Sequence, residues 1–133
     1  MSTVDHLDAL VAAPFPAEGH HLVVLRAGQD FWDAGLDAVE AADEEMEAAL
    51  QELAAALTTR WGPPEKIDLA PYLEAETPEP ITTLCMVAGS MLVWRRPEAG
   101  RWVALTVGQA DREFPIELIA VVSDVPLGQR REG

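Results

Sequence analysis

Apolar residues recur every three or four positions over residues 34–61, which is the spacing of one face of an α-helix. Alanine, the residue with the highest helix propensity, fills most of the remaining positions. Gly62-Pro63-Pro64 ends the pattern. We therefore predict one long amphipathic helix. Its apolar stripe consists of Leu36, Val39, Met46, Leu50, Leu53, Leu57 and Trp61.

Asp43 interrupts this stripe, because on a helix its side chain projects close to the centre of the apolar face. Two interpretations are open. Either the first half of the helix extends beyond the core, or Asp43 meets an arginine from the sheet. The first is favoured, because an unpaired buried carboxylate is costly.

Strands are predicted mainly in the last third of the chain. One further short apolar run, residues 21–26, also indicates a strand. The later segments are rich in Val, Leu, Ile, Trp and Thr, as strands are. They are Thr82–Ala88, Met91–Arg96, Trp102–Val107 and Ile116–Val122.

The turn Pro97–Gly100 sets the register of a hairpin. Pairing Arg96 with Arg101 places Trp94 opposite Val103 and produces one apolar face that should receive the long helix. That face carries Leu92, Trp94, Val103, Leu105 and Val107. The opposite face carries Met91, Val93, Arg95, Trp102, Ala104 and Thr106.

This opposite face is too apolar for a solvated surface, and apolar area with aromatic residues and arginine is typical of an interface. Two covers are possible: the first short helix or residues 21–26, or a partner chain. A partner chain implies a homodimer. We leave both open.

The remaining segments complete an α+β prediction. Residues 4–13 have helical spacing and end before Pro14, which indicates a short N-terminal helix. Residues 62–80 contain five prolines and are expected to be a crossing loop. Residues 1–133 should form a single domain, with the long helix packed on an antiparallel sheet of about four to five strands.

Charge is unevenly distributed along the chain, whose net charge is −14. Residues 1–80 contain 17 acidic and 3 basic residues, whereas residues 81–133 contain 6 of each, so the whole excess lies in the first part. Such a surface repels phosphate backbones, so we predict no nucleic-acid partner. It would attract a basic protein or a cation, or it simply confers solubility.

The compartment is predicted from what the sequence lacks. Cys85 is the only cysteine, so no internal disulfide forms, as is usual in a reducing compartment. Neither a signal peptide nor a long apolar run is visible. We expect a soluble cytoplasmic protein without a membrane anchor. Abundant alanine and the use of arginine for eight of nine basic residues indicate GC-rich, bacterial coding.

No catalytic motif is recognisable, so an enzyme is the less favoured class. His20 and His21 follow Glu18 and offer the one local grouping of imidazole and carboxylate beyond the first residues. Adjacent side chains on a strand point to opposite faces, so the two histidines are not expected to share a metal. Cys85 lies in an apolar run and is expected to be a buried hydrophobic residue rather than a nucleophile.

Two charged groups remain. The acidic ladder Glu40, Glu44 and Glu47, with Asp43 nearby, either binds a divalent cation or forms a solvated helix face, and the second is favoured. No metal or cofactor is predicted. Four arginines near the hairpin either clamp an anion or neutralise the acidic helix, in the same chain or in a second copy, and we prefer the latter. They are Arg95, Arg96, Arg101 and Arg112.

Two functions of different classes follow. The favoured one is a protein-interaction module, namely an adaptor, a chaperone-like subunit or an inhibitor or immunity-type protein, whose acidic helix face covers a basic partner. The alternative is a small enzyme or ligand-binding domain with a pocket between helix and sheet near His21, Trp94 and Arg95. The predicted interaction residues are Asp37, Glu40, Glu44, Glu47, Met91, Val93, Arg95 and Trp102.

Overall fold

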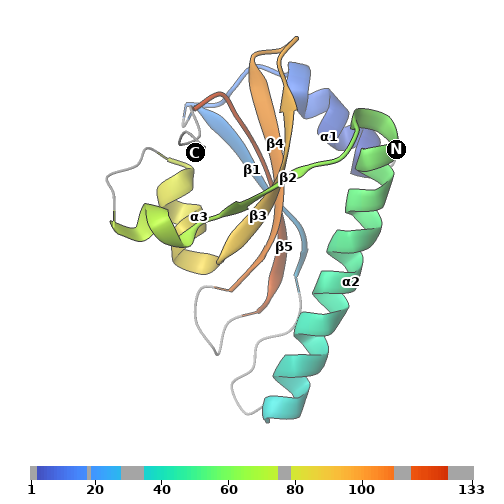
Figure 1. Ribbon diagram of the computed structural model, residues 1–133, viewed down its shortest axis with the longest axis vertical. Coiled ribbons are helices and arrows are strands. Elements are labelled where there is room, and N and C mark those ends of the chain that lie inside the picture. The colour runs from blue at the N-terminus through green and yellow to red at the C-terminus, as the bar shows by residue number, and fades with distance from the viewer. Residues whose placement is uncertain (1–2, 18, 28–34, 75–78, 110–114, 126–133) are drawn as a thin grey trace.

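The computed structural model describes residues 3–17, 19–27, 35–74, 79–109 and 115–125. Within them, helices flank both faces of a five-stranded antiparallel sheet, which confirms the α+β prediction (Figure 1). The helices are α1 (Thr3–Ala12), α2 (Leu36–Trp61), the 3-10 helix η1 (Ala70–Glu74) and α3 (Ile81–Val87). The strands are β1 (His20–Ala27), β2 (Glu65–Asp68), β3 (Ser90–Arg96), β4 (Arg101–Gly108) and β5 (Glu117–Ser123).

The strand order in the sheet is β1-β5-β4-β3-β2, so β3, β4 and β5 form a meander with β1 and β2 at the edges. The hairpin register is as predicted, with Arg96 opposite Arg101 and Trp94 opposite Val103. Gly100 has a φ of 69° at the end of the turn, a conformation that glycine adopts without steric cost.

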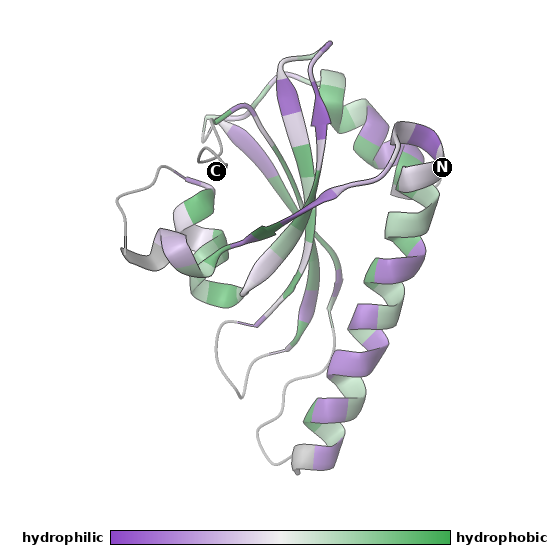
Figure 2. Ribbon diagram, viewed as in Figure 1, coloured by the Kyte–Doolittle hydropathy of each residue, from purple (hydrophilic) through white to green (hydrophobic). Residues whose placement is uncertain are grey.

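Helix α2 lies against the sheet face predicted for it, and its apolar stripe supplies half of that core. Met46, Leu50 and Leu57 pack with Trp94 and Leu105. Figure 2 shows hydrophobic and hydrophilic bands alternating along α2, as expected of a helix with one buried side. Burial of these large side chains is the main stabilising contribution on this face.

The opposite face of the hairpin is covered within the chain, but by neither of the N-terminal elements that we expected. Helix α3 and η1 lie on it, and Ile81 and Leu84 pack against Met91, Val93 and Trp102. All five side chains are buried. A partner chain is therefore not needed to cover this face, and the reason for predicting a homodimer through it disappears.

The prediction of a strand at Thr82–Ala88 is wrong, because this segment forms α3. Its β-branched residues favour a strand, yet Ile81, Leu84 and Cys85 are buried at helical spacing. The carboxylate of Glu79 accepts hydrogen bonds from the backbone N–H of Thr83, at 3.1 Å, and from the Thr83 hydroxyl, at 2.7 Å. This contact satisfies a free N–H at the start of the helix, and it outweighs the strand propensity of a short segment.

The prediction of a plain loop over residues 62–80 is also incomplete. The segment contains β2, which pairs with β3 from Glu65 opposite Val93 to Asp68 opposite Ser90, and then η1. Strand β2 has no apolar run, because it is a sheet edge held by backbone hydrogen bonds. Hydrophobic periodicity therefore gives no sign of it.

Helix α1 closes the α2 side of the sheet through Arg101. The Arg101 guanidinium donates hydrogen bonds to the carbonyl oxygens of Leu10, at 3.1 Å, and Ala13, at 2.5 Å. It also lies over the Phe15 ring, 3.8 Å from the ring centre. A cation at the end of a helix satisfies free carbonyls and suits the helix dipole, so Arg101 fixes the C-terminus of α1.

Candidate functional site

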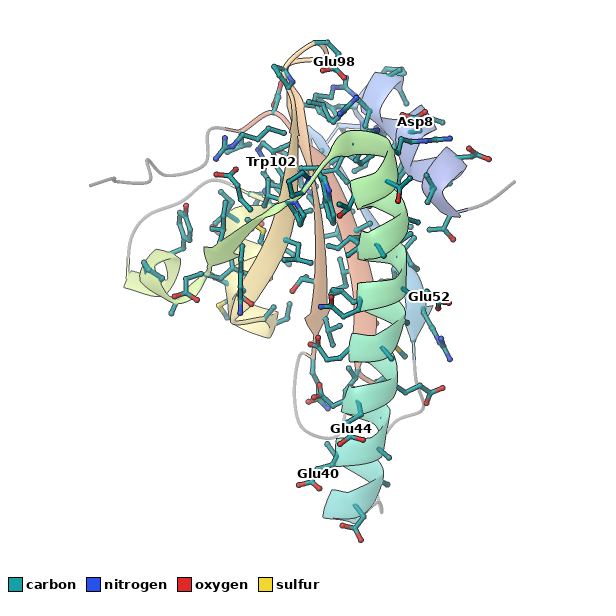
Figure 3. The ribbon with its side chains drawn as sticks, turned by 45° about the vertical axis from the view of Figure 1, so that its right-hand side comes forward. Asp8, Glu40, Glu44, Glu52, Glu98 and Trp102 are labelled. Carbon is teal, nitrogen blue, oxygen red and sulfur yellow. The ribbon has the colours of Figure 1, made fainter. Side chains whose placement is uncertain are left out.

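The first half of α2 projects beyond the sheet. From Asp37 to Glu45 no residue is fully buried, and the first buried side chain of the described part of the helix is Met46. Figure 1 shows this end of α2 extending past the strands, and Figure 3 places Glu40 and Glu44 on the projecting part. The overhang is thus the correct interpretation of Asp43, which is exposed.

A hollow lies where this projecting half leaves the sheet. It has a volume of about 350 Å³. We call it the acidic notch, and it is lined by Val39, Glu40, Asp43, Glu44, Gln109 and Ile116. Ile116 is buried and Val39 half-buried, so the floor is apolar, whereas the three carboxylates are exposed.

The carboxylates of the notch are not neutralised by the described part of the chain. Within those residues, Glu40, Asp43 and Glu44 lie within ion-pairing distance of no basic group, whereas the neighbouring Glu45 pairs with Arg26 at 2.8 Å. An apolar floor beside free carboxylates matches the side chains of lysine and arginine, which have an apolar stem and a charged head. The notch has the chemistry to take a basic side chain from another molecule.

The acidic ladder does not converge on a metal site. Among the described residues, no group of three or more His, Cys, Asp or Glu side chains is arranged to hold a metal ion. Asp37, Glu40, Glu44 and Glu47 are each exposed along the helix. Successive turns separate them, and a helix cannot bring more than neighbouring pairs together.

The hairpin arginines described by the structure do not neutralise α2. Arg95 pairs with Glu65 on β2 at 2.6 Å, and Arg96 pairs with Glu98 in the turn at 2.6 Å. Neither acid lies on α2, and Arg101 is engaged by α1. Arg112 lies outside the described residues. The arginines therefore serve separate local contacts, and they do not form the anion clamp that was considered.

The other predicted interaction residues have different surroundings. Met91, Val93 and Trp102 are buried under α3, and the Trp102 indole N–H donates to the carbonyl of Val125 at 2.7 Å. Arg95 is exposed. Three of the four hairpin residues are thus enclosed in the folded chain, and the surface that remains from the prediction is the acidic helix face together with Arg95.

The pocket predicted near His21, Trp94 and Arg95 does not form, because these side chains point to different places. His21 stacks near Phe15, with ring centres 5.4 Å apart. The Trp94 indole N–H donates to Gly62 O at 2.9 Å, inside the core. Arg95 faces the other side of the sheet. His20 and His21 pair with consecutive residues of β5 and so lie on opposite faces, as expected. Glu18 is outside the described residues.

A cavity between helix and sheet exists elsewhere. It has a volume of about 290 Å³ and lies where α2 faces β2, β3 and β4. Its polar lining includes Glu47, Gln51, Lys66, Ser90 and Thr106. The Thr106 hydroxyl is already engaged, since it donates to Ser90 O at 2.6 Å. Glu47 and Lys66 supply opposite charges to its lining.

Cys85 is buried in α3, and its thiol donates to the carbonyl of Thr82 at 3.3 Å. The expectation of burial is confirmed, although the segment is a helix and not a strand. A thiol that is enclosed and bonded to its own helix packs as a small apolar residue.

Sequence reasoning identified the acidic half of α2 but missed two walls of the notch. Gln109 and Ile116 come from the end of β4 and the approach to β5, about 70 residues further along the chain. No local pattern distinguishes them from other residues near strand ends. Their part in the notch follows only from the packing of α2 on the sheet.

Comparison of the chain with protein-family models, with curated proteins and with solved structures finds no match. Among the helices in the described ranges, none combines the length and the apolar character that crossing a membrane requires.

Proposed function

We propose that this protein is a protein-interaction module that binds a basic segment of a partner in the acidic notch. The observation that supports this proposal is the pairing of three free carboxylates with an apolar floor, at the end of a helix that projects from the fold. An adaptor, a chaperone-like subunit and an inhibitor or immunity-type protein all act by covering a surface of another protein. The notch is compatible with each of them.

The distribution of charge supports a basic partner. The net charge of −14 accelerates encounter with a positively charged surface, and the notch lies in the acidic first part of the chain. Exposed ion pairs contribute only about 0.2–1 kcal/mol each. The apolar floor formed by Val39 and Ile116 therefore has to contribute as well, through contact with the stem of the bound lysine or arginine.

Neutralising the notch should abolish most of this binding. In the triple variant Glu40→Gln, Asp43→Asn and Glu44→Gln, we expect affinity for the partner captured from native-host lysate to fall about tenfold, since three weak ion pairs are lost together. Binding of the unaltered chain should be strong at about 0.05 M salt and largely lost at about 0.5 M, where screening is short-ranged. Isothermal titration with the purified partner measures both effects.

A matched control separates the notch from net charge. The variant Glu52→Gln, Asp68→Asn and Asp124→Asn removes three exposed carboxylates elsewhere and should bind as the unaltered chain does. If both triple variants lose affinity equally, charge alone is responsible and the notch is not the site. Recovery of background proteins only, at low salt, would contradict an interaction module altogether.

The cavity between α2 and the sheet supports the second candidate, a ligand-binding domain. Glu47 and Lys66 would orient a small polar molecule that carries both charges. A thermal-shift screen of amino acids, nucleotides and metals tests it, because a ligand well above its Kd raises apparent stability by a few kcal/mol. A shift that Lys66→Ala removes, while the notch variants keep it, would favour this function over the first.

The cellular setting belongs to the same proposal. A single buried cysteine supports a reducing compartment, and we place the module in the cytoplasm. The acidic first part of the chain supports a protein partner over a nucleic acid.

A further inference from the structure

The two edges of the sheet are protected to different degrees. Strand β2 is short, and Glu65, Lys66 and Asp68 place charges along it. Strand β1 is eight residues long and pairs only on one side, with β5. Its outer row of N–H and C=O groups faces no other strand in the part of the chain that the structure describes. An edge of this length is a ready template for a further strand.

The side chains of β1 add an apolar surface to this edge. Leu22 is 39% exposed and Val24 45% exposed, although both are large hydrophobic residues. They lie opposite Val121 and Ile119 of β5 and so share the sheet face that α3 covers further along. Exposed edges usually carry lysine, proline or inward-pointing charge, and residues 22–25 of β1 carry none of these.

Local charge indicates which molecule this edge accepts. The chain has a net charge of −14, yet β1 contains no acidic residue, and it carries His20, His21 and Arg26. Two copies that meet through most of their surfaces would juxtapose carboxylates. At β1 they meet without that repulsion, and the basic end of one strand faces a molecule that is acidic overall.

We infer that β1 pairs antiparallel with β1 of a second copy of this chain. In the pairing that matches the exposed apolar residues, a two-fold axis passes through Val23, and Leu22 of each copy lies opposite Val24 of the other. The two sheets then form one continuous sheet, and four exposed apolar side chains are covered together. Cross-strand apolar pairs of this kind stabilise a sheet. This inference is independent of the acidic notch, which lies on α2.

Sedimentation of Val24→Lys tests the inference against a matched variant. The unaltered chain should be dimeric at about 100 μM, and Val24→Lys should weaken dimerisation at least tenfold, because an ammonium group then lies in the apolar contact. Met86→Lys makes the same change of charge at a side chain that is 70% exposed on α3 and should leave the dimer intact. Circular dichroism confirms that both variants fold.

Two further measurements define the arrangement. Alternate amides of β1 should exchange hydrogen quickly when the chain is dilute and slowly at about 100 μM, because pairing protects the outer row. An equimolar mixture of Leu22→Cys and Val24→Cys chains should form the mixed disulfide in preference to either symmetric one, because these residues face each other across the axis.

A chain that stays monomeric at about 100 μM, with alternate β1 amides exchanging freely, overturns the inference and leaves the edge for a strand of another protein. Equal weakening by Val24→Lys and Met86→Lys would overturn it as well. A preference for symmetric disulfides would overturn the assigned register.

Discussion

Replacement of Trp94 by alanine is expected to lower the free energy of unfolding by about 3–5 kcal/mol, the usual cost of truncating a buried aromatic side chain. Trp94 is 2% exposed and contacts Trp61 edge-on, with ring centres 6.5 Å apart. Its indole N–H also donates to Gly62 O, which ties the C-terminus of α2 to the sheet. Urea unfolding followed by circular dichroism measures the loss.

Two variants show the origin of this effect. Trp94→Phe keeps most of the apolar contact but leaves the Gly62 carbonyl without its donor, so it should cost about 1–2 kcal/mol. Glu44→Ala, on the solvated part of α2, should stay within about 0.5 kcal/mol of the unaltered chain. A Trp94→Ala protein as stable as Glu44→Ala would mean that α2 does not pack on this face of the sheet.

Replacement of Leu84 by alanine is expected to cost about 2–4 kcal/mol, because this side chain is 0% exposed beneath α3. Met86→Ala should be neutral within about 0.5 kcal/mol, since Met86 is exposed. Alanine has the highest helix propensity, so neither change weakens the helix itself, and the loss at Leu84 reports packing alone. The same urea titration measures both variants.

The comparison of these two positions distinguishes the helix from the strand that the sequence suggested. On a strand, residues 84 and 86 point to the same face, and truncating either should have a similar effect. On α3 they point in different directions. Equal costs at Leu84 and Met86 would contradict the helix, and with it the intramolecular cover over Met91, Val93 and Trp102.

The long-range features of the sheet were predictable only where a local signal fixed them. Pro97–Gly100 determined the hairpin register, because a short turn leaves few ways to align its strands. The position of β1 beside β5 had no such signal. Nor did β2, whose residues pair through the backbone and bury little.

The candidate site divides in the same way. Charge and periodicity identified the acidic face of α2, including Glu40 and Glu44, because both properties are local to the helix. The hairpin residues Met91, Val93 and Trp102 were also proposed for interaction, and the structure encloses them. A pattern shows that a face is apolar, but it does not show which segment of the chain covers that face.

The sequence by itself determined the elements whose pattern repeats: α1, the amphipathic α2 and its stop, and the hairpin with one face toward α2. Such repetition records burial against a single neighbour, so it is visible without knowing that neighbour. The tertiary structure alone decided that Thr82–Ala88 is helical, that this helix covers the back of the sheet, and that Gln109 and Ile116 complete the notch. In short segments, local propensity differs by less than the energy of packing and capping, so contacts with distant residues decide the outcome.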